Sequence, residues 1–327
     1  MSNIQFSRVG KVGYITLDRP KALNSLTHEM IRDIHAALRQ HEQDDQVELI
    51  ILRSSAERAF CAGGDMKATR LMAIDKQWDE LNRFFAEEYA LNLHIGQCAK
   101  TYISMINGVA MGGGLGLSVH GDVVVVSETA KLAMPETAIG FFPDVGGTHF
   151  LSSLPYDSGL WLALTGMPVI GTQAVSVGLA THCVPQSEWE SLYSAFEELG
   201  QHAVDKALPL ASKNPNDGAS QNEFTATLKQ RQEWFSEPDQ ESLLAVLASN
   251  AESNADAQQL LARLHKMSPY AMGLTRKLLA EAQGHKLVTC LKRELAAARE
   301  AVQHPDFIEG IRAVLVDKDS PVWSERG

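Results

Sequence analysis

Short hydrophobic runs separated by polar turns fill the first half of the chain and predict β-strands. Ile4–Val9 and Val12–Leu17 flank Gly10-Lys11, two residues suited to a tight turn, so this stretch predicts a β-hairpin. Four further runs have the length and apolar content of buried strands, namely Val47–Arg53, Tyr102–Ile106, Asp122–Val126 and Thr181–Val184. The pattern therefore predicts a sheet whose strands are spread over residues 1–185.

Hydrophobic residues at helical spacing lie between the strand-like runs. After Thr27, a residue type that caps helix N-termini, the recurring positions are Met30, Ile31, Ile34, Ala37 and Leu38. Strand and helix patterns that alternate in this way predict an α/β fold of strand–turn–helix units with largely parallel strand pairing.

Beyond Pro185 the pattern becomes almost wholly helical. Two apolar stripes stand out, one formed by Leu260, Leu261, Leu264 and Met267, the other by Phe307, Ile308, Ile311, Val314 and Leu315. Residues 212–218 are the best loop candidate in this part. We therefore predict two domains, a core of residues 1–185 and a helical C-terminal region of residues 186–327 that covers the core or serves oligomerisation.

Two glycine-rich turns follow two of the predicted strands. Ala59–Asp65 comes after the run that ends at Arg53, and Asn107–Gly116 comes directly after Ile106. Glycines at a strand-to-helix turn let the backbone approach a ligand closely with its N–H groups pointing outward. Such turns could hold a phosphate or an oxyanion, and close packing of a helix on a strand explains them equally well. Neither turn matches a Walker sequence or G-x-G-x-x-G.

Two carboxylates lie in a hydrophobic setting in the segment Met134–Gly147. They are Glu136 and Asp144, and their neighbours are Ile139, Phe141, Phe142 and Val145. Burying an ionised carboxylate is costly unless it is paired or its pKa rises, so two acids here suit a site where one does chemistry and the other orients a group or shares a proton. The structural alternative is a helix-capping glutamate and a turn aspartate after Pro143.

These three segments together resemble the enoyl-CoA hydratase/isomerase (crotonase) superfamily, and within it the 3-hydroxyisobutyryl-CoA hydrolase branch. Asp18–Leu26 resembles the superfamily's opening coenzyme A motif. Four segments resemble the hydrolase branch, namely Phe84–Asn92, Gly116–Gly121, Met134–Gly147 and Asp306–Asp319. Thr101 departs from the proline usual before Tyr102 in that branch.

The resemblance implies a spiral of ββα units and a set of site residues. The backbone N–H groups of Gly64 and Gly113 would hold the charge that develops on a thioester oxygen. Glu136 would be the main catalytic carboxylate and Asp144 the second. Glu88 matches a substrate-contacting position, although a packing or salt-bridge role fits it as well. Further contacts with substrate or coenzyme A would come from Lys21, Ala22, Leu23, Ala62, Asp65, Met66 and Lys67.

Gly116 decides which reaction the resemblance implies. Hydratases of the superfamily carry a glutamate at this position, and here no side chain is present. Glu136 would then act with Asp144, which implies hydrolysis of a short 3-hydroxyacyl thioester, most simply 3-hydroxyisobutyryl-CoA in valine catabolism. Glu136 would attack the carbonyl or activate water, and Asp144 would bind the substrate hydroxyl and help to move the proton.

Composition narrows the partners and the compartment. A net charge of −11 over 327 residues argues against nucleic acid or an anionic membrane, and local positive charge from Arg19, Lys21 and Lys67 would have to meet a nucleotide. The four cysteines are widely spaced and the histidines show no ligand spacing, which predicts neither a disulfide framework nor a metal site. We expect a cytoplasmic enzyme without a separate cofactor, since coenzyme A is part of the substrate, and a homo-oligomer, usually a trimer in this superfamily.

Two rival interpretations remain open. Another enzyme of the superfamily could use the same carboxylates, either as an isomerase with Glu136 as sole base or as a dehalogenase with Asp144 as nucleophile. A coenzyme A ester-binding protein without turnover belongs to a different class. Release of free thiol from an acyl-CoA ester separates a hydrolase from all three.

Overall fold

A computed structural model describes residues 3–211 and 218–324 of the chain. Contacts divide the chain into two units. The first comprises Met1–Asp65, Glu87–Leu132 and Val169–Gln221, and the second comprises Met66–Ala86, Ala133–Pro168 and Asn222–Gly327. Of the predicted loop at residues 212–218, positions 212–217 lie outside the described residues. The proposed domain boundary at residue 185 stays a prediction.

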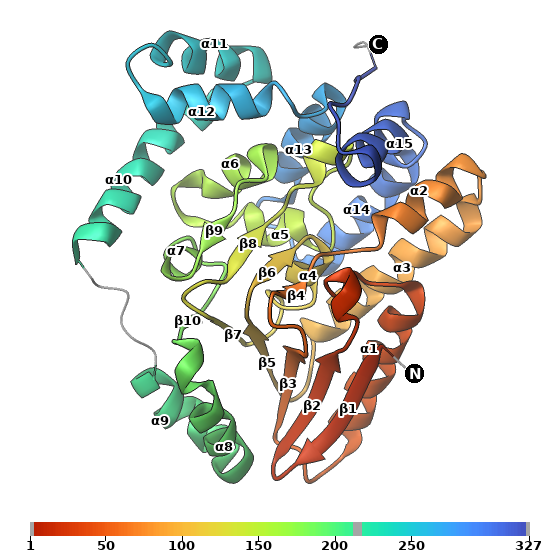
Figure 1. Cartoon of the computed structure of the whole chain (residues 1–327), viewed down its shortest axis with the longest axis vertical. Coiled ribbons are helices and arrows are strands. Elements are labelled where there is room, and N and C mark those ends of the chain that lie inside the picture. Colours follow the sequence, from red (N-terminus) through yellow and green to blue (C-terminus); the bar gives the residue numbers. More distant parts are fainter. Residues whose placement is uncertain (1–2, 212–217, 325–327) are drawn as a thin grey trace. The chain divides into compact units, whose positions relative to one another are not determined.

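A six-stranded sheet forms the centre of the first unit (Figure 1). Its strands, in spatial order, are β1 (Ile4–Val9), β2 (Val12–Leu17), β3 (Leu49–Ser54), β5 (Thr101–Ile106), β7 (Val123–Val126) and β10 (His182–Cys183). β1 and β2 pair antiparallel as the predicted hairpin, and every other pair in this sheet is parallel. The predicted strands and their parallel pairing are confirmed.

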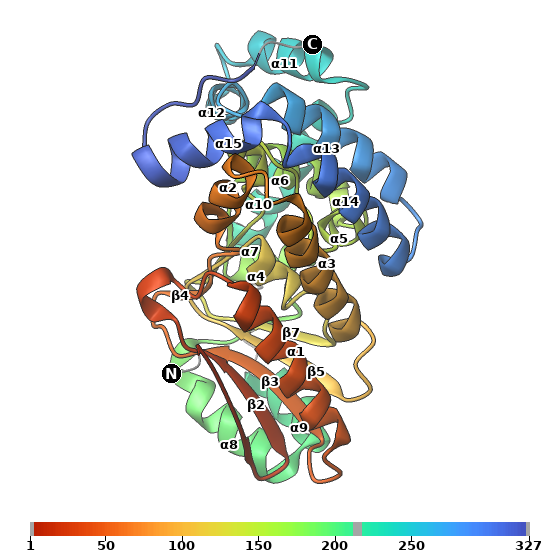
Figure 2. The same ribbon diagram turned by 90° about the vertical axis from the view of Figure 1, so that its right-hand side faces the viewer.

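Helices cover both faces of this sheet. α1 (His28–Gln43) begins after Thr27, whose side chain accepts a hydrogen bond from Met30 N, as predicted. It packs on β1 and β2, and Figure 2 shows it lying along one face. Successive side chains of a strand point to opposite faces. Tyr14 and Ile51 therefore face away from α1 and pack on α8 (Trp189–Leu199) and α9 (Gln201–Ala211).

A second sheet of four short strands completes the first unit and carries its turns. Its order is β4 (Ala59–Cys61), β6 (Val109–Met111), β8 (Lys131–Ala133) and β9 (Val169–Ile170). β4 and β6 pair in parallel, so the glycine-rich turns that follow them leave the sheet at the same end. α4 (Gly113–Gly116) and α7 (Thr172–Ser176) are the short helices of this part. α3 (Trp78–Ile95) and β8 each contain a point of division between the two units.

The second unit is built mainly from helices. They are α2 (Met66–Ile74), α5 (Gly147–Leu151), α6 (Ser158–Thr165), α10 (Gly218–Phe235), α11 (Gln240–Asn250), α12 (Ala255–Leu264), α13 (Pro269–Ala282), α14 (Leu287–Ala301) and α15 (Pro305–Ile311). Shorter helical turns include η2 (Glu136–Ile139) and the π-helix η5 (Arg312–Asp317). Every described element after β10 is helical, which confirms the predicted change of pattern beyond Pro185. Within the described residues, no helix has both the length and the hydropathy to cross a membrane.

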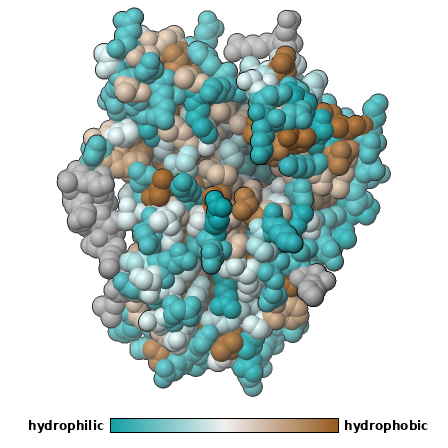
Figure 3. Space-filling view, viewed as in Figure 1, coloured by the Kyte–Doolittle hydropathy of each residue, from teal (hydrophilic) through white to brown (hydrophobic). Residues whose placement is uncertain are grey.

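The predicted C-terminal stripe serves mostly the core of the second unit. Phe307 and Ile311 are fully buried, whereas Val314 is exposed. α2 packs against both α15 and η5, and hydrophobic residues gather on this part of the surface in Figure 3. The stripe therefore covers its own unit first, and the expected homo-oligomer stays a prediction.

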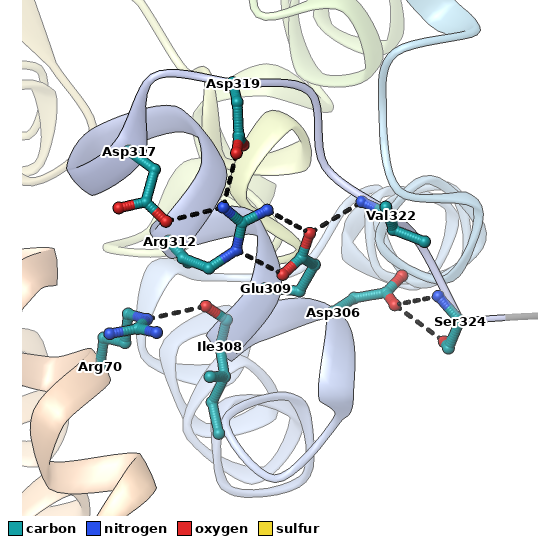
Figure 4. A network of polar contacts seen from close by, with 9 residues as sticks. All are labelled: Arg70, Asp306, Ile308, Glu309, Arg312, Asp317, Asp319, Val322 and Ser324. Atoms are coloured by element: carbon teal, nitrogen blue, oxygen red, sulfur yellow. Dashed lines mark hydrogen bonds and ion pairs between the residues drawn. The ribbon is translucent and has the colours of Figure 1, made fainter.

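Arg312 organises the polar side of the same region (Figure 4). Its guanidinium contacts Glu309, Asp317 and Asp319 at 2.7–2.8 Å. Glu309 also accepts a hydrogen bond from Val322 N at 2.8 Å. The hydrogen bonds from Arg312 lower the pKa of Glu309 to about 2, so the Glu309 carboxylate stays ionised near neutral pH.

Candidate active site

The first glycine turn lies beside the segment that resembles a coenzyme A motif. Ala62 N donates to Leu23 O at 3.0 Å, and Leu26 N donates to Gly63 O at 2.8 Å. Asp65 N returns a hydrogen bond to Leu26 O at 2.9 Å. The two segments thus form a short parallel bridge centred on Gly64.

This bridge determines where the Gly64 N–H points. In a parallel bridge, one residue makes both hydrogen bonds, to the two residues that flank the residue opposite. The N–H of that opposite residue points to the other side. Leu26 bonds the two residues that flank Gly64, so the Gly64 N–H faces the other side, and it donates no hydrogen bond among the described residues. Gly63 has φ +94°, which favours glycine at this turn.

The second glycine turn brings Gly113 next to Gly64. Gly113 is the first residue of α4, and the N–H groups of a first helical turn have no partner within the helix. A Cβ built on Gly113 would lie 3.4 Å from Gly64 N and 2.6 Å from Oε1 of Glu88. The structure therefore brings Gly64, Gly113 and Glu88 together in the first unit. Glu88 is only 2% exposed.

The other predicted contacts divide between the two units. Lys21 and Ala22 end the short 3₁₀ turn Pro20–Ala22, and Leu23 follows in the left-handed region at φ +50°. Asp65 is paired with Arg19 at 3.0 Å. Met66 and Lys67 begin α2 and belong to the second unit. Of these side chains, Lys21, Leu23 and Lys67 are exposed.

Glu136 is the first residue of η2 in the second unit and is 7% exposed. Contacts from distant segments hold this turn in place. Ser268 N donates to Thr137 O at 3.1 Å, and the Ser268 hydroxyl donates to Asp306 Oδ2 at 2.5 Å. Gly140 ends the turn at φ +72°, where a Cβ would lie 2.1 Å from Asp306 O. The C-terminal segment that resembles the hydrolase branch thus supports the turn that carries Glu136.

Aromatic rings pack directly after Glu136. Phe141 stacks on Phe142 with ring centroids 4.6 Å apart and on Phe85 at 5.5 Å. It also contacts Phe307 of α15 at 5.6 Å. All four rings are buried in the second unit.

Asp144 lies in a strained turn and is 6% exposed. Its carbonyl accepts a hydrogen bond from Gly147 N at 2.6 Å. Val145 has φ +55° and Gly146 has φ +79°. A β-branched residue in the left-handed region is an outlier that its surroundings must hold in place.

A residue that was not predicted from the sequence holds this turn. Glu294 on α14 is fully buried, and its carboxylate accepts hydrogen bonds from Gly146 N, Thr148 N and the Thr148 hydroxyl. Burial raises its pKa to about 7, although the three hydrogen bonds act in the opposite direction. A signal was present in the sequence, because Glu294 lies on the apolar face of its helix, three and four residues from Leu291 and Cys290.

Comparison with known families decides the class of protein. A family model described as Enoyl-CoA hydratase/isomerase matches residues 12–326. The chain belongs to this family. Two curated relatives, from Danio rerio and Bos taurus, are both named "3-hydroxyisobutyryl-CoA hydrolase, mitochondrial" and are 39% identical. Each match covers 98% of this chain, together with 85% of the first relative and 84% of the second.

Solved structures of the enoyl-CoA hydratase/isomerase family share the fold over nearly the whole chain. A structure titled as a carnitinyl-CoA dehydratase from Mycobacterium thermoresistibile has a TM-score of 0.90 and 36% identity, covering 99% of this chain and 92% of that one. A structure titled as an enoyl-CoA hydratase from Rhodobacter sphaeroides has a TM-score of 0.87 and 34% identity, with 99% and 93% coverage. The predicted crotonase-like fold is confirmed, and membership of the family implies an acyl-CoA substrate.

Proposed function

We propose that this chain hydrolyses the thioester of a short 3-hydroxyacyl-CoA, most simply 3-hydroxyisobutyryl-CoA. The N–H groups of Gly64 and Gly113 would hold the thioester oxygen as it becomes negative. Glu136 would attack the carbonyl carbon or remove a proton from the attacking water. Asp144 would accept a hydrogen bond from the substrate's 3-hydroxyl.

The observation that carries the proposal is the absence of a side chain at Gly116. Gly116 ends α4, three residues after Gly113, and is buried. By the resemblance, a hydratase has a glutamate here, so that two acid–base groups flank the double bond. Without it, the carboxylates that remain to act on the acyl group are Glu136 and Asp144, which suits attack on the carbonyl instead.

The geometry of the glycine turns supports the first step. Two backbone donors that lie side by side require no rearrangement when the oxygen becomes charged. Attack at the carbonyl carbon forms a tetrahedral intermediate, whose collapse breaks the C–S bond and releases coenzyme A as a thiol. Water supplies the oxygen of the product acid, by direct attack or by hydrolysis of an acyl–Glu136 intermediate. Both routes give the same products.

The names of the relatives support two candidate functions. The curated relatives are named as hydrolases at 36–39% identity, whereas the two structures at 34–36% identity are titled as a dehydratase and a hydratase. Addition or removal of water at a double bond is therefore the second candidate. Gly116 favours the hydrolase.

A side-by-side assay tests the proposal. Thiol release is followed with 3-hydroxyisobutyryl-CoA, and loss of the conjugated enoyl thioester absorbance is followed with methacrylyl-CoA and crotonyl-CoA. We expect rapid thiol release from the hydroxylated ester and little hydration of the enoyl esters. Hydration without thiol release would replace the proposal with the second candidate, and binding without either reaction would indicate a coenzyme A ester-binding protein.

A further inference from the structure

We propose that Glu294 is a positioning residue, which holds the turn after Asp144 so that the Asp144 carboxylate meets the substrate hydroxyl. This inference rests on the proposed function, because it takes the role of Asp144 from there. Nothing in the resemblance or in the relatives' names assigns a role to position 294.

Within the described part of the chain, the hydrogen bonds of the Glu294 carboxylate all come from one short segment. Oε2 accepts from Gly146 N at 2.7 Å, while Oε1 accepts from Thr148 N at 3.0 Å and from the Thr148 hydroxyl at 2.5 Å. All three donors lie two to four residues after Asp144. They are separated from Glu294 by about 150 positions in sequence. A helix that is distant in sequence, α14, therefore holds this turn.

The turn needs such a restraint because its backbone is strained. Val145 and Gly146 are consecutive residues with positive φ, and a left-handed non-glycine residue persists only when its surroundings impose it. Val145 has no glycine-like freedom and follows Asp144 directly. If the Gly146 N–H lost its acceptor, Val145 would relax toward a negative φ, and the side chain of Asp144 would turn with it.

A carboxyl group fits these contacts better than an amide does. Three donors converge on two oxygens, and an amide would bring its own NH₂ group against one of them. Burial raises the pKa of Glu294, so the protein keeps a costly group at this position. Cys290, one turn earlier on α14, is the titratable neighbour whose pKa responds to Glu294. α5 and α13 pack on α14, but among the described residues neither helix has a charged side chain that changes the pKa of Glu294.

Two variants with a matched control test the proposal. Glu294→Gln removes one acceptor, Thr148→Val removes the hydroxyl donor, and Thr148→Ser keeps that hydroxyl. The measured quantity is the ratio of kcat/KM for 3-hydroxyisobutyryl-CoA to that for isobutyryl-CoA. We expect Glu294→Gln to lower this ratio by about tenfold and Thr148→Val by about fivefold, since each loses a buried hydrogen bond, with Thr148→Ser close to wild type. A merely structural role would lower both rates together and leave the ratio unchanged.

Amide hydrogen exchange gives a second readout that does not depend on activity. Exchange at Gly146 and Thr148 should be at least about tenfold faster in Thr148→Val and in Glu294→Gln than in wild type, while the β1–β2 hairpin stays unchanged. An unchanged substrate ratio would overturn the positioning role whatever the exchange rates, and unchanged exchange would show that Glu294 does not hold the turn. If wild type releases no thiol, the proposed function fails, and faster exchange alone still shows that Glu294 holds the turn. If Glu294→Gln does not fold, the Thr148 pair decides the question by both readouts.

Discussion

The glycine turns of the first unit and the carboxylate turn of the second unit are positioned by different means. Gly64 and Gly113 are placed by backbone hydrogen bonds and by close approach, since a Cβ on Gly113 would meet Glu88 and Leu26. The turn at Asp144 depends instead on a side chain, Glu294, from a helix far along the chain. The backbone donors therefore need few particular side chains, whereas the carboxylate turn needs a buried acid at one position.

This difference separates two kinds of sensitivity to mutation. A backbone donor is lost only when its peptide moves, so it responds to added volume at a glycine. Asp144 lies in a turn that is held by the carboxylate of Glu294. Its position therefore responds to removal of the charge at Glu294, to pH and to changes in the donors that bind Glu294. Substitutions at the two places should thus have distinguishable signatures.

The largest effect is expected for Glu136→Gln. The amide can neither attack the carbonyl nor accept a proton, so kcat should fall by about 100- to 1,000-fold, or about 3–4 kcal/mol of transition-state stabilisation. Binding of the coenzyme A ester should change little. The measurement is steady-state thiol release together with calorimetric binding of the substrate, and a variant that keeps a tenth of normal turnover would remove Glu136 from the reaction.

The next effect concerns stability and depends on pH through Glu294. The pKa of this carboxyl is 4.5 when unfolded and about 7 when folded, so the folded protein binds the extra proton between those values. Protonation of Glu294 therefore stabilises the folded protein. This contribution is fully present below pH 4.5 and is lost as the pH rises through 7, which lowers the free energy of unfolding by on the order of 3 kcal/mol in total. Glu294→Gln does not titrate there. In urea titrations from pH 4.5 to 8, wild type should therefore lose stability relative to this variant, and a parallel pH dependence would contradict the assignment.

Gly113→Ala tests the backbone donors. The new Cβ would lie 2.6 Å from Oε1 of Glu88 and 3.4 Å from Gly64 N, so the carboxylate or the turn must shift. We expect kcat/KM to fall by about 30-fold, or about 2 kcal/mol, which is in the range for a misplaced oxyanion donor. Wild-type kinetics in a folded variant would exclude Gly113 from the site.

Gly273→Ala is the matched control and has the smallest expected effect. Gly273 lies within α13, and a Cβ there would have no neighbour within 4 Å among the described residues. Alanine should stabilise the helix by about 0.5–1 kcal/mol and leave turnover unchanged. A loss of activity here would mean that glycine-to-alanine changes disturb this chain generally, and the result at Gly113 would then lose its meaning.

The fold could be predicted from sequence because its signals are local. The hairpin, the cap at Thr27 and the parallel strands each follow from a few neighbouring residues, and the structure confirms them within one or two positions. The division of contacts into two discontinuous units was not predictable in this way. It depends on which distant segments pack together, and periodicity carries no information on that.

The site shows the same limit. Glycine turns and acidic residues in apolar runs are local patterns. The four candidate site residues Gly64, Gly113, Glu136 and Asp144 could therefore be named from the sequence. The supports for the Glu136 turn, Ser268 and Asp306, and the support for the Asp144 turn, Glu294, act over long separations. Glu294 gave a signal, as an acid on an apolar helix face, and Asp306 begins a segment that resembles the hydrolase branch. The partners of both could be identified only in three dimensions.

The most direct measurement is the preference of wild type for a hydroxylated ester, with Asp144→Ala beside it. Leaving a buried carboxylate without its hydroxyl partner costs about 1–3 kcal/mol, so kcat/KM should be at least about fivefold higher for 3-hydroxyisobutyryl-CoA than for isobutyryl-CoA. Asp144→Ala should slow the hydroxylated ester much more than the plain one and bring the ratio close to one. Equal rates on both esters in wild type would contradict recognition of the hydroxyl and leave a general acyl-CoA thioesterase.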